Sequence, residues 1–242
     1  MTAKPAKFAL FDLDDTLVVT AEPFRAFCRE FVLKYAVTGI AGGGEADTSV
    51  ETARLLSSRI ASTSWREFCD KAEEWYGITA PREELFAWVL ATYPAKFTLD
   101  PRVAKGLTGL RADGWKLGIV TNGTTAVQQA KIDYAGLREY VDFAIDSDTA
   151  GARKPDPRVF RMAAEGLGVE LGPHGWMVGD NHACDIVGGH GVGLRTIWLP
   201  YDDEQPADAI RPDHACATIL EAIEIIAAGP GAGTAPAAPD AE

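Results

Sequence analysis

The sequence predicts an α/β fold, a Rossmann-like core with a parallel five-stranded sheet and an inserted all-helical cap. Short apolar segments without strict polar alternation are typical of parallel strands that are buried on both faces. Helical patterns separate the later apolar segments, as they do in doubly wound sheets. Between the first and second apolar segments, from about residue 20 to 95, only helical patterns occur.

The elements of the core can be placed from their patterns. The expected strands, in chain order, span residues 8–11, 117–120, 143–145, 176–178 and 196–199. Two helices between them carry end signals, because Asp100 and Asp156 are suited to N-caps and each precedes a proline. Gly114 follows the first of these helices, where a glycine commonly ends a helix.

The helical stretch is expected to form the cap. In "EPFRAFCREFVLKYAV" the apolar residues share one helical face: Phe24, Phe27, Cys28, Phe31, Val32 and Tyr35. A capping box from Ser64 to Glu67 opens another helix, which ends at Gly77. Further helices are expected from Pro81 and over "TSVETARLLSSRIA", with a glycine-rich loop at 39–48.

These patterns divide the chain into three parts. Residues 1–19 and 96–226 form the core, and residues 20–95 form the cap. Residues 227–242, "AAGPGAGTAPAAPDAE", are rich in Ala, Pro and Gly and have no apolar period. We expect this tail to be disordered, because it has too little apolar surface to offset the entropy of ordering.

Composition excludes some classes of partner. The chain has 242 residues, a formal net charge of −12 and a pI near 4.8, which argues against nucleic acid and against an anionic membrane. No segment approaches the ~20 apolar residues that span a bilayer. The 4 Cys have no metal-finger spacing, and free thiols suit a cytoplasmic protein. The sequence does not distinguish a monomer from a homodimer.

Residues that follow the expected strands define a candidate site, because ligands of open α/β sheets bind beyond the carboxyl ends of the strands. Three aspartates follow the first strand, and a threonine and an asparagine follow the second. A lysine in "GARKPDP" follows the third, and two aspartates in "GDNHACD" follow the fourth. The candidates are Asp12, Asp14, Asp15, Thr121, Asn122, Lys154, Asp180 and Asp185.

The crowded aspartates admit three explanations: a divalent cation, a phosphate chemistry that uses paired carboxylates, or a solvated turn. The whole set can assemble phosphoryl transfer. Asp12 and Asp180 would hold Mg²⁺, which prefers oxygen ligands, and Asp12 would attack phosphorus to form an aspartyl-phosphate. Asp14 would protonate the leaving oxygen and then deprotonate the attacking water.

The phosphate group itself needs donors. Thr121 and Lys154 would bind its equatorial oxygens as charge shifts between them, and Asn122 is a further candidate phosphate-binding residue. Each of these residues also has an ordinary structural interpretation. Thr121 alone could cap a helix, Asn122 could form a plain turn, and Lys154 could be a surface charge.

Four segments, "FDLDDTL", "GIVTNG", the lysine of "RKPDPRVF" and "GDNHACD", resemble the four ordered motifs of the haloacid dehalogenase-like (HAD) hydrolases. The resemblance runs from about residue 7 to 200. It implies Asp12 as the nucleophile, Asp14 as the acid/base, and Thr121 and Lys154 as phosphate-binding groups. It implies Mg²⁺ held by Asp12, by the backbone carbonyl of Asp14 and by Asp180, with Asp185 orienting a metal-bound water or Lys154.

The resemblance also bears on the reaction. The helical insertion is similar to the C1 cap of the family, and Asp14 favours a phosphatase, because dehalogenase members lack a carboxylate at that position. The implied substrate is a small phosphorylated metabolite, such as a nucleoside monophosphate or a sugar phosphate. "VTNGTTAVQQAKIDYAGLREYVD" looks closest to the nucleotidase-like and N-acylneuraminate-9-phosphatase-like branch. The alternatives are a 2-haloacid dehalogenase and a non-catalytic member that binds a partner.

Some residues near the motifs have two interpretations. His182 and His190 stand in and after the fourth motif, where smaller residues are more familiar in the family, and they either pack locally or alter the substrate pocket. Trp65, Trp75 and Trp88 in the cap could stack on a base, although their helical spacing favours core packing. Arg66, next to Trp65 at a helix N-terminus, is a candidate for contacting a substrate anion.

Overall fold

A computed structural model describes the chain over residues 6–35, 65, 67, 69, 70, 78, 80–201 and 209–229. Several expected features lie outside these residues: the loop at 39–48, the helix over "TSVETARLLSSRIA", most of the helix from Ser64 to Gly77 including Arg66 and Trp75, and the tail beyond Gly229. Their assignment stays a prediction.

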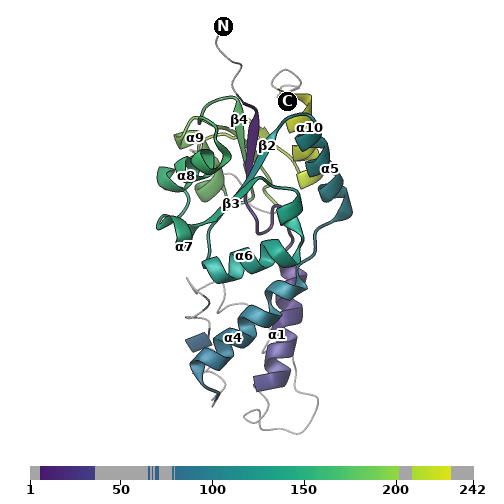
Figure 1. The fold of residues 1–242 in the computed structure, drawn as a ribbon, viewed down its shortest axis with the longest axis vertical. Coiled ribbons are helices and arrows are strands. Elements are labelled where there is room, and N and C mark those ends of the chain that lie inside the picture. The colour runs from purple at the N-terminus through teal and green to yellow at the C-terminus, as the bar shows by residue number, and fades with distance from the viewer. Residues whose placement is uncertain are drawn as a thin grey trace, which may run out of the picture.

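The core is a sheet with strand order β3-β2-β1-β4-β5-β6, and every pairing in it is parallel. The strands are β1 (Phe8–Phe11), β2 (Lys116–Thr121), β3 (Phe143–Asp146), β4 (Gly175–Gly179), β5 (Arg195–Trp198) and β6 (His214–Ala215). The α/β class with a parallel sheet is confirmed. β1 lies between β2 and β4, so the carboxyl ends of these strands meet at one edge (Figure 1).

The predicted number of strands is wrong by one. β6 has two residues, His214 and Ala215, and pairs with the end of β5. Cys216 continues this pairing, because its backbone N–H donates to the carbonyl oxygen of Trp198 at 3.0 Å. A two-residue edge strand contains no apolar run, so a search for periodicity does not detect it.

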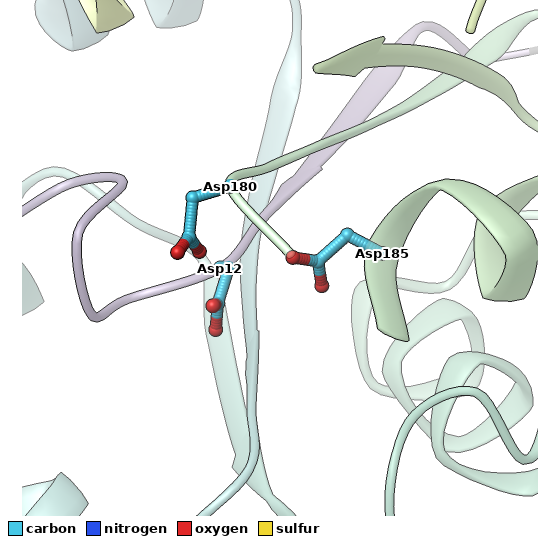
Figure 2. Close-up of side chains that lie close together, drawn as sticks. All are labelled: Asp12, Asp180 and Asp185. Carbon is cyan, nitrogen blue, oxygen red and sulfur yellow. The ribbon is translucent and has the colours of Figure 1, made fainter. Parts of the chain in front are cut away.

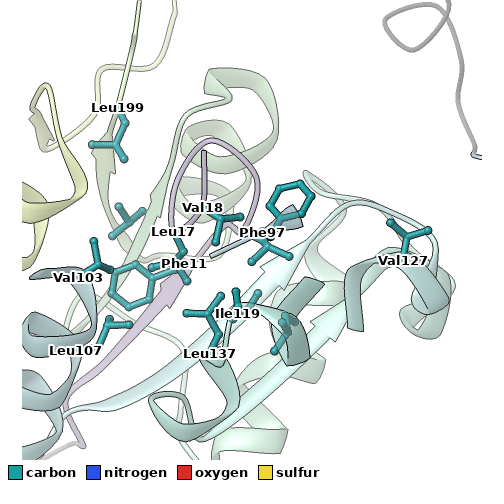
Figure 3. Packing of buried hydrophobic residues seen from close by; sticks show 14 of the residues in the cluster. Phe11, Leu17, Val18, Phe97, Val103, Leu107, Ile119, Val127, Leu137 and Leu199 are labelled. Carbon is teal, nitrogen blue, oxygen red and sulfur yellow. The ribbon is translucent and has the colours of Figure 1, made fainter. Parts of the chain in front are cut away.

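Helices cover both faces of the sheet. Alternate residues of β1 point to opposite faces, so Phe11 packs toward α5 (Pro101–Ala112) and α10 (Ile219–Ala228), whereas Leu10 packs toward α8 (Pro157–Leu167). Figure 1 shows α5 and α10 on one side of the sheet and α8 with α9 (Val187–Gly191) on the other. Figure 3 shows Phe11 beside Val103 and Leu107 of α5.

The predicted helix ends are confirmed where the structure describes them. The Asp100 side chain accepts from the N–H of Arg102 at 2.7 Å, and Asp156 accepts from the N–H of Arg158 at 2.9 Å. Gly114 has φ +80°, the left-handed conformation expected after a helix. The predicted start of the tail is two residues too early, because α10 continues through Ala228.

The described part of the insertion is helical. It contains α1 (Ala21–Tyr35), α4 (Arg82–Thr92) and the short helix η1 (Pro94–Lys96). Aromatic rings of the insertion pack on one another, and the ring centroids of Trp65 and Tyr93 lie 4.5 Å apart. The ring centroids of Trp88 and Phe27 lie 5.4 Å apart, so Trp65 and Trp88 both pack against aromatic residues of the insertion.

Helix α6 (Thr125–Tyr134) joins the two parts of the molecule. It follows the end of β2 and contacts η1 and α4, and Figure 1 shows it between the sheet and the helices α1 and α4. The helix thus adjoins both the carboxyl edge of the sheet and η1, by which the inserted helical segment returns to the sheet.

Candidate active site

The three aspartates that follow β1 point to different partners. Asp12 pairs with Lys154 at 2.7 Å, Asp14 pairs with Lys131 at 2.6 Å, and Asp15 accepts from the hydroxyl of Thr20 at 2.7 Å. Their apparent crowding in the sequence is therefore resolved by the turn after β1, which separates the carboxylates in space.

Asp12 belongs to a cluster of carboxylates. One carboxylate oxygen from each of Asp12, Asp180 and Asp185 lies within 4.8 Å of the others. Figure 2 shows the Asp12 and Asp180 side chains pointing the same way from the ends of β1 and β4, with Asp185 reaching toward them from the next helical turn. The parallel pairing of β1 with β4 creates this proximity, because it brings both strand ends to the same level.

Lys154 is the cation of this cluster. Its Nζ lies 2.7 Å from Asp12 Oδ1 and 2.7 Å from Asp185 Oδ1, and it donates to the carbonyl oxygen of Val120 at 2.7 Å. The side chain is 1% exposed, so the ammonium is fully removed from water. Its three N–H groups match these three acceptors.

The pKa values of the cluster follow from burial and charge. Burial opposes the charge of Lys154, but Asp12 and Asp185 outweigh this and hold the pKa of the ammonium above its ordinary value. Burial, with repulsion from Asp12 and Asp185, raises the pKa of Asp180 to about 8. Burial likewise raises the pKa of Asp185, and the attraction of Lys154 only partly offsets it. One ammonium does not neutralise three carboxylates.

The cluster fits a divalent cation. Within the described residues, Asp12, Asp185 and Asp15 repel the charge of the Asp180 carboxylate, and a hydrogen bond from its own backbone offsets this repulsion only in part. Three buried or half-buried carboxylates facing one ammonium carry a formal excess of two negative charges. Oxygen ligands in this number suit a hard cation that also keeps water ligands.

The loop after β4 fixes Asp185. This residue lies in the helical turn η3 (His182–Ile186), and its Oδ2 accepts from the N–H of Asn181 at 3.1 Å. A Cβ on Gly179, the last residue of β4, would overlap the Asp185 carboxylate. The motif therefore needs glycine at position 179 to let Asp185 approach the strand end.

Asn122 connects the second and third motifs. Its Oδ1 accepts from the backbone N–H of Lys154 at 2.8 Å, and its Nδ2 donates to the carbonyl oxygen of Lys154 at 3.1 Å. Both ends of the amide are thus used to hold the backbone that carries the lysine. In this structure the Asn122 side chain orients Lys154, so any contact of residue 122 with a phosphate would fall to its backbone.

Asp14 lies in different surroundings from Asp12. Lys131 Nζ lies 2.6 Å from Asp14 Oδ1, and Gln128 Nε2 donates to Asp14 Oδ2 at 2.8 Å. Gln128 Nε2 also donates to Thr121 Oγ1 at 2.7 Å. The amide of Gln128 therefore connects the expected acid/base to the expected phosphate-binding hydroxyl.

Sequence reasoning missed Gln128 and Lys131. Both come from α6 and both are 2% exposed, which is unusual for their residue types. Their spacing of three residues, directly after the Thr-Asn-Gly segment, places both on one helical face. A pair of polar residues on one face of a helix that begins at the site was the sequence signal that could have indicated Gln128 and Lys131.

Asp15 has a structural role. Its φ is +54°, and its carboxylate accepts from both the N–H and the hydroxyl of Thr20 at 2.8 Å. This contact closes the turn between the first motif and α1. Thr20 is buried, so the turn is fixed where the chain passes from the sheet to α1.

The two histidines contact no cluster carboxylate that the structure describes. A ring nitrogen of His182 lies 2.8 Å from the carbonyl oxygen of Ile210, and its ring meets Trp198 edge-on at 5.3 Å. His190 is exposed near the end of α9. Burial raises the pKa of the nearby Cys184 thiol, which agrees with an unreactive cysteine.

Comparison with known proteins identifies the family. The model of the haloacid dehalogenase-like hydrolases matches residues 6–193, most of the chain. The chain therefore belongs to this family, it is a hydrolase, and the resemblance noted in the four motifs is confirmed.

Particular relatives are phosphatases. A glyceraldehyde 3-phosphate phosphatase of Pyrococcus furiosus is 28% identical over 226 residues, 91% of each chain. Pyrimidine 5'-nucleotidase YjjG of Escherichia coli is 32% identical over 126 residues, so the match spans 52% of this chain and about half of that protein, 56%.

Solved structures with this fold come from two branches. A HAD phosphatase from Thermococcus onnurineus superposes with a TM-score of 0.68 at 29% identity, covering 91% of this chain and 97% of that one. A 2-haloacid dehalogenase from Pseudomonas syringae has a TM-score of 0.66 at 25% identity, covering 92% and 99%. The fold therefore leaves the choice between the two reactions to the residues of the site.

Proposed function

We propose that this protein is a Mg²⁺-dependent phosphatase that hydrolyses a small phosphomonoester through an aspartyl-phosphate. The observation that carries the proposal is Asp14, a second carboxylate two residues after Asp12, which has its own ammonium partner at 2.6 Å. A reaction that expels an alcohol needs a group to supply a proton, whereas expulsion of a halide does not. The haloacid reaction is therefore the less favoured alternative.

The first half of the reaction transfers the phosphoryl group. A carboxylate oxygen of Asp12 attacks phosphorus, a P–O bond forms, and the ester P–O bond breaks. Asp14, in its protonated form, gives its proton to the departing oxygen, which leaves as an alcohol. Thr121 and Lys154 donate to the oxygens of the transferring group and stabilise their charge.

The second half restores the enzyme. Asp14, now a carboxylate, takes a proton from water as the water oxygen attacks phosphorus. The P–O bond to Asp12 breaks, and inorganic phosphate leaves. In both halves of the reaction Asp14 transfers the proton, first as an acid and then as a base. This role agrees with its position, because Asp14 is near the nucleophile in the sequence but does not belong to the carboxylate cluster.

The cluster residues have supporting roles in this proposal. Asp12, Asp180 and the backbone carbonyl of Asp14 would hold Mg²⁺, and Asp185 would orient Lys154, which it contacts at 2.7 Å. The bound cation would supply charge compensation between the carboxylates and the substrate dianion.

The substrate class follows from the relatives and from the cap. We include nucleoside monophosphates and sugar phosphates, because relatives are named for a nucleotide and for a triose phosphate. The proposed C1 cap, residues 20–95, would close over the site and select the leaving group. The site thus suits a small phosphorylated metabolite.

The setting of the protein is also proposed. No helix in the described part of the chain is long and apolar enough to cross a membrane. The four cysteines are free, which agrees with a reducing cytoplasm. The net charge of −12 disfavours nucleic acid as a partner, and a monomer or a homodimer would each be compatible with the site.

The test is a substrate panel. Purified protein with Mg²⁺ is assayed for phosphate release from nucleoside monophosphates, sugar phosphates and an aryl phosphate, and for halide release from 2-haloacids. Phosphate release that EDTA abolishes is the expected result. Halide release without phosphate release would replace the proposal by the dehalogenase alternative, and no turnover at all would favour a non-catalytic, partner-binding protein.

A further inference from the structure

Helix α6 sends two buried polar side chains toward the site. Gln128 and Lys131 are each 2% exposed, and neither belongs to the four motifs. Burying an ammonium or an amide costs free energy unless partners compensate for the lost water. Their partners therefore show what these two side chains do.

The first partner is the Asp14 carboxylate. Lys131 contacts Oδ1 at 2.6 Å and Gln128 donates to Oδ2 at 2.8 Å, so the two side chains hold different oxygens of the carboxylate. Two donors on different oxygens fix both the position and the plane of the carboxyl group. A carboxylate offers about four acceptor positions, so these donors do not by themselves saturate it.

The second partner is Thr121. Its Oγ1 accepts from Gln128 Nε2 at 2.7 Å, and the NH₂ of Gln128 has two hydrogens, one for each partner. A hydroxyl whose oxygen accepts from Gln128 directs its own hydrogen elsewhere. That hydrogen is then available to an oxygen of the transferring phosphoryl group, which Thr121 is proposed to bind.

The packing around Gln128 and Lys131 accommodates both side chains specifically. A Cβ on Gly123 would lie 2.6 Å from Gln128 Cγ and 2.7 Å from Cδ, so the glycine makes room for this amide. Lys131 Nζ lies 5.1 Å from the ring centroid of Tyr93 and 4.9 Å from that of Phe97. These aromatic faces attract a cation, and they flank η1, through which the cap returns to the core.

We propose that Gln128 and Lys131 are positioning residues for the reaction: together they hold the acid/base Asp14, and Gln128 also orients the Thr121 hydroxyl. This inference rests on the proposed phosphatase function. It assigns α6 the task of connecting the proton-transfer residue to the phosphate-binding residue. Both side chains act through the residues that they contact, Asp14 and Thr121.

The inference makes a specific kinetic prediction. An alkyl phosphomonoester needs a proton on its leaving oxygen, whereas p-nitrophenyl phosphate expels a stable anion without one. The quantity kcat/KM covers only the steps through departure of the leaving group, so later hydrolysis of the aspartyl-phosphate does not affect it. A displaced Asp14 should therefore lower kcat/KM for the alkyl ester much more than for the aryl ester.

The experiment compares matched variants on both esters. The alkyl ester is the one that the unmodified protein turns over fastest in the substrate panel, and the aryl ester is p-nitrophenyl phosphate. Gln128→Met should lower the alkyl-to-aryl ratio of kcat/KM at least about tenfold, which is part of the roughly 10²–10⁴-fold that a positioned general acid contributes. Gln129→Met is the control, because Gln129 is the same residue type on α6 and donates to Asp146 at 2.9 Å.

Lys131 provides a second arm in case Gln128→Met does not fold. Lys131→Met should lower the same ratio, and Lys131→Arg, which keeps the charge, should restore part of it. Lys96→Met is the control, since Lys96 lies in η1 and pairs with Glu30 at 2.6 Å. Thermal melts of all variants separate loss of folding from loss of positioning.

A double-mutant cycle tests whether the pair acts through Asp14. In an Asp14→Asn background, Gln128→Met should change the alkyl-to-aryl ratio less than about twofold. Equal losses on both esters, or an equal effect in the Asp14→Asn background, would overturn the inference and leave the phosphatase function standing. An unmodified protein that hydrolyses neither ester would overturn both.

Discussion

The two halves of the site differ in how the charge of their carboxylates is balanced. On the side of β1 and β4, Asp12 shares Lys154 with Asp185 and lies beside Asp180. On the side of α6, Asp14 has its own ammonium, Lys131, at 2.6 Å. The first half carries an excess of negative charge, and the second half balances its charge from within the chain.

This difference separates two chemical tasks. A cluster with excess negative charge is incomplete without an added cation, so its geometry and stability should depend on metal and on pH. A carboxylate with a matched ammonium and an amide donor depends on packing instead. We therefore expect changes in the cluster and changes on α6 to have distinguishable effects.

The largest effect is expected from Asp12→Asn. The amide keeps the shape of the side chain but cannot form the aspartyl-phosphate, so phosphatase turnover should fall at least about 10³-fold while the fold persists. Turnover of p-nitrophenyl phosphate, and mass spectrometry of protein quenched with substrate, provide the measurement. A variant that keeps more than about a tenth of the activity would rule out covalent catalysis by Asp12.

The next effect distinguishes the halves by their metal dependence. Asp180→Asn should raise the Mg²⁺ concentration for half-maximal activity about tenfold or more, because it removes a charged oxygen ligand. Asp14→Asn is the matched control: it also removes a carboxylate, but from the α6 half, and it keeps the backbone carbonyl. Both variants are assayed on the aryl ester. Equal Mg²⁺ titrations for the two would contradict the division of the site into a metal-binding half and an α6 half.

The residues of the carboxylate cluster could be predicted from the sequence more completely than those of the α6 half. Asp12, Lys154, Asp180 and Asp185 follow strand ends, and the rule that strand ends meet brings them together before any coordinates are known. Gln128 and Lys131 lie inside a helix, where their types suggest a solvated surface. Only the position of α6 against η1 shows that this surface is buried.

The same limit of prediction from sequence applies to the fold: elements with local signals are predicted, and elements that depend on distant contacts are not. Apolar segments and capping residues predicted the parallel sheet and the helix ends, because those signals act locally. The strand β6 has two residues and depends on pairing with β5, so it carries no local signal. Asn122 was expected to bind phosphate. Its side chain makes two hydrogen bonds to the backbone of Lys154, a residue 32 positions away in the sequence.

A smaller effect concerns stability. Burial and repulsion raise the pKa of Asp180 from 3.8 to about 8, so the folded protein favours the protonated carboxyl. Because a raised pKa stabilises the fold at low pH, the metal-free protein should lose stability as pH rises from 5 through 8. Mg²⁺ favours the ionised carboxylate, so its stabilising effect should be largest at pH 8 and small at pH 5.

Thermal melts with EDTA or with Mg²⁺ measure this. Mg²⁺ at 100 times its Kd would contribute about 2.7 kcal/mol, or about 5–10 °C in Tm for a chain of this size. Asp180→Asn should show a weaker dependence of Tm on pH and a smaller gain from Mg²⁺. A Tm that responds neither to pH nor to Mg²⁺ would mean that the cluster does not hold a cation.

The smallest effect tests the α6 half through its packing. A Cβ on Gly123 would lie 2.6 Å from Gln128 Cγ, closer than carbon atoms approach, so Gly123→Ala should displace the Gln128 amide. The displacement should loosen both Asp14 and Thr121. We expect kcat/KM for the alkyl ester to fall about threefold to tenfold, less than the loss from Gln128→Met, with a smaller fall for the aryl ester.

Gly109→Ala is the matched control for this change. Gly109 lies on the exposed side of α5, and a Cβ there would meet no atom within 4 Å. Alanine in a helix is favoured over glycine by about 0.5–1 kcal/mol, so the control should raise Tm slightly and leave both esters unaffected. If Gly123→Ala behaves like Gly109→Ala on both esters, the amide of Gln128 tolerates displacement, and the link between Asp14 and Thr121 does not depend on its position.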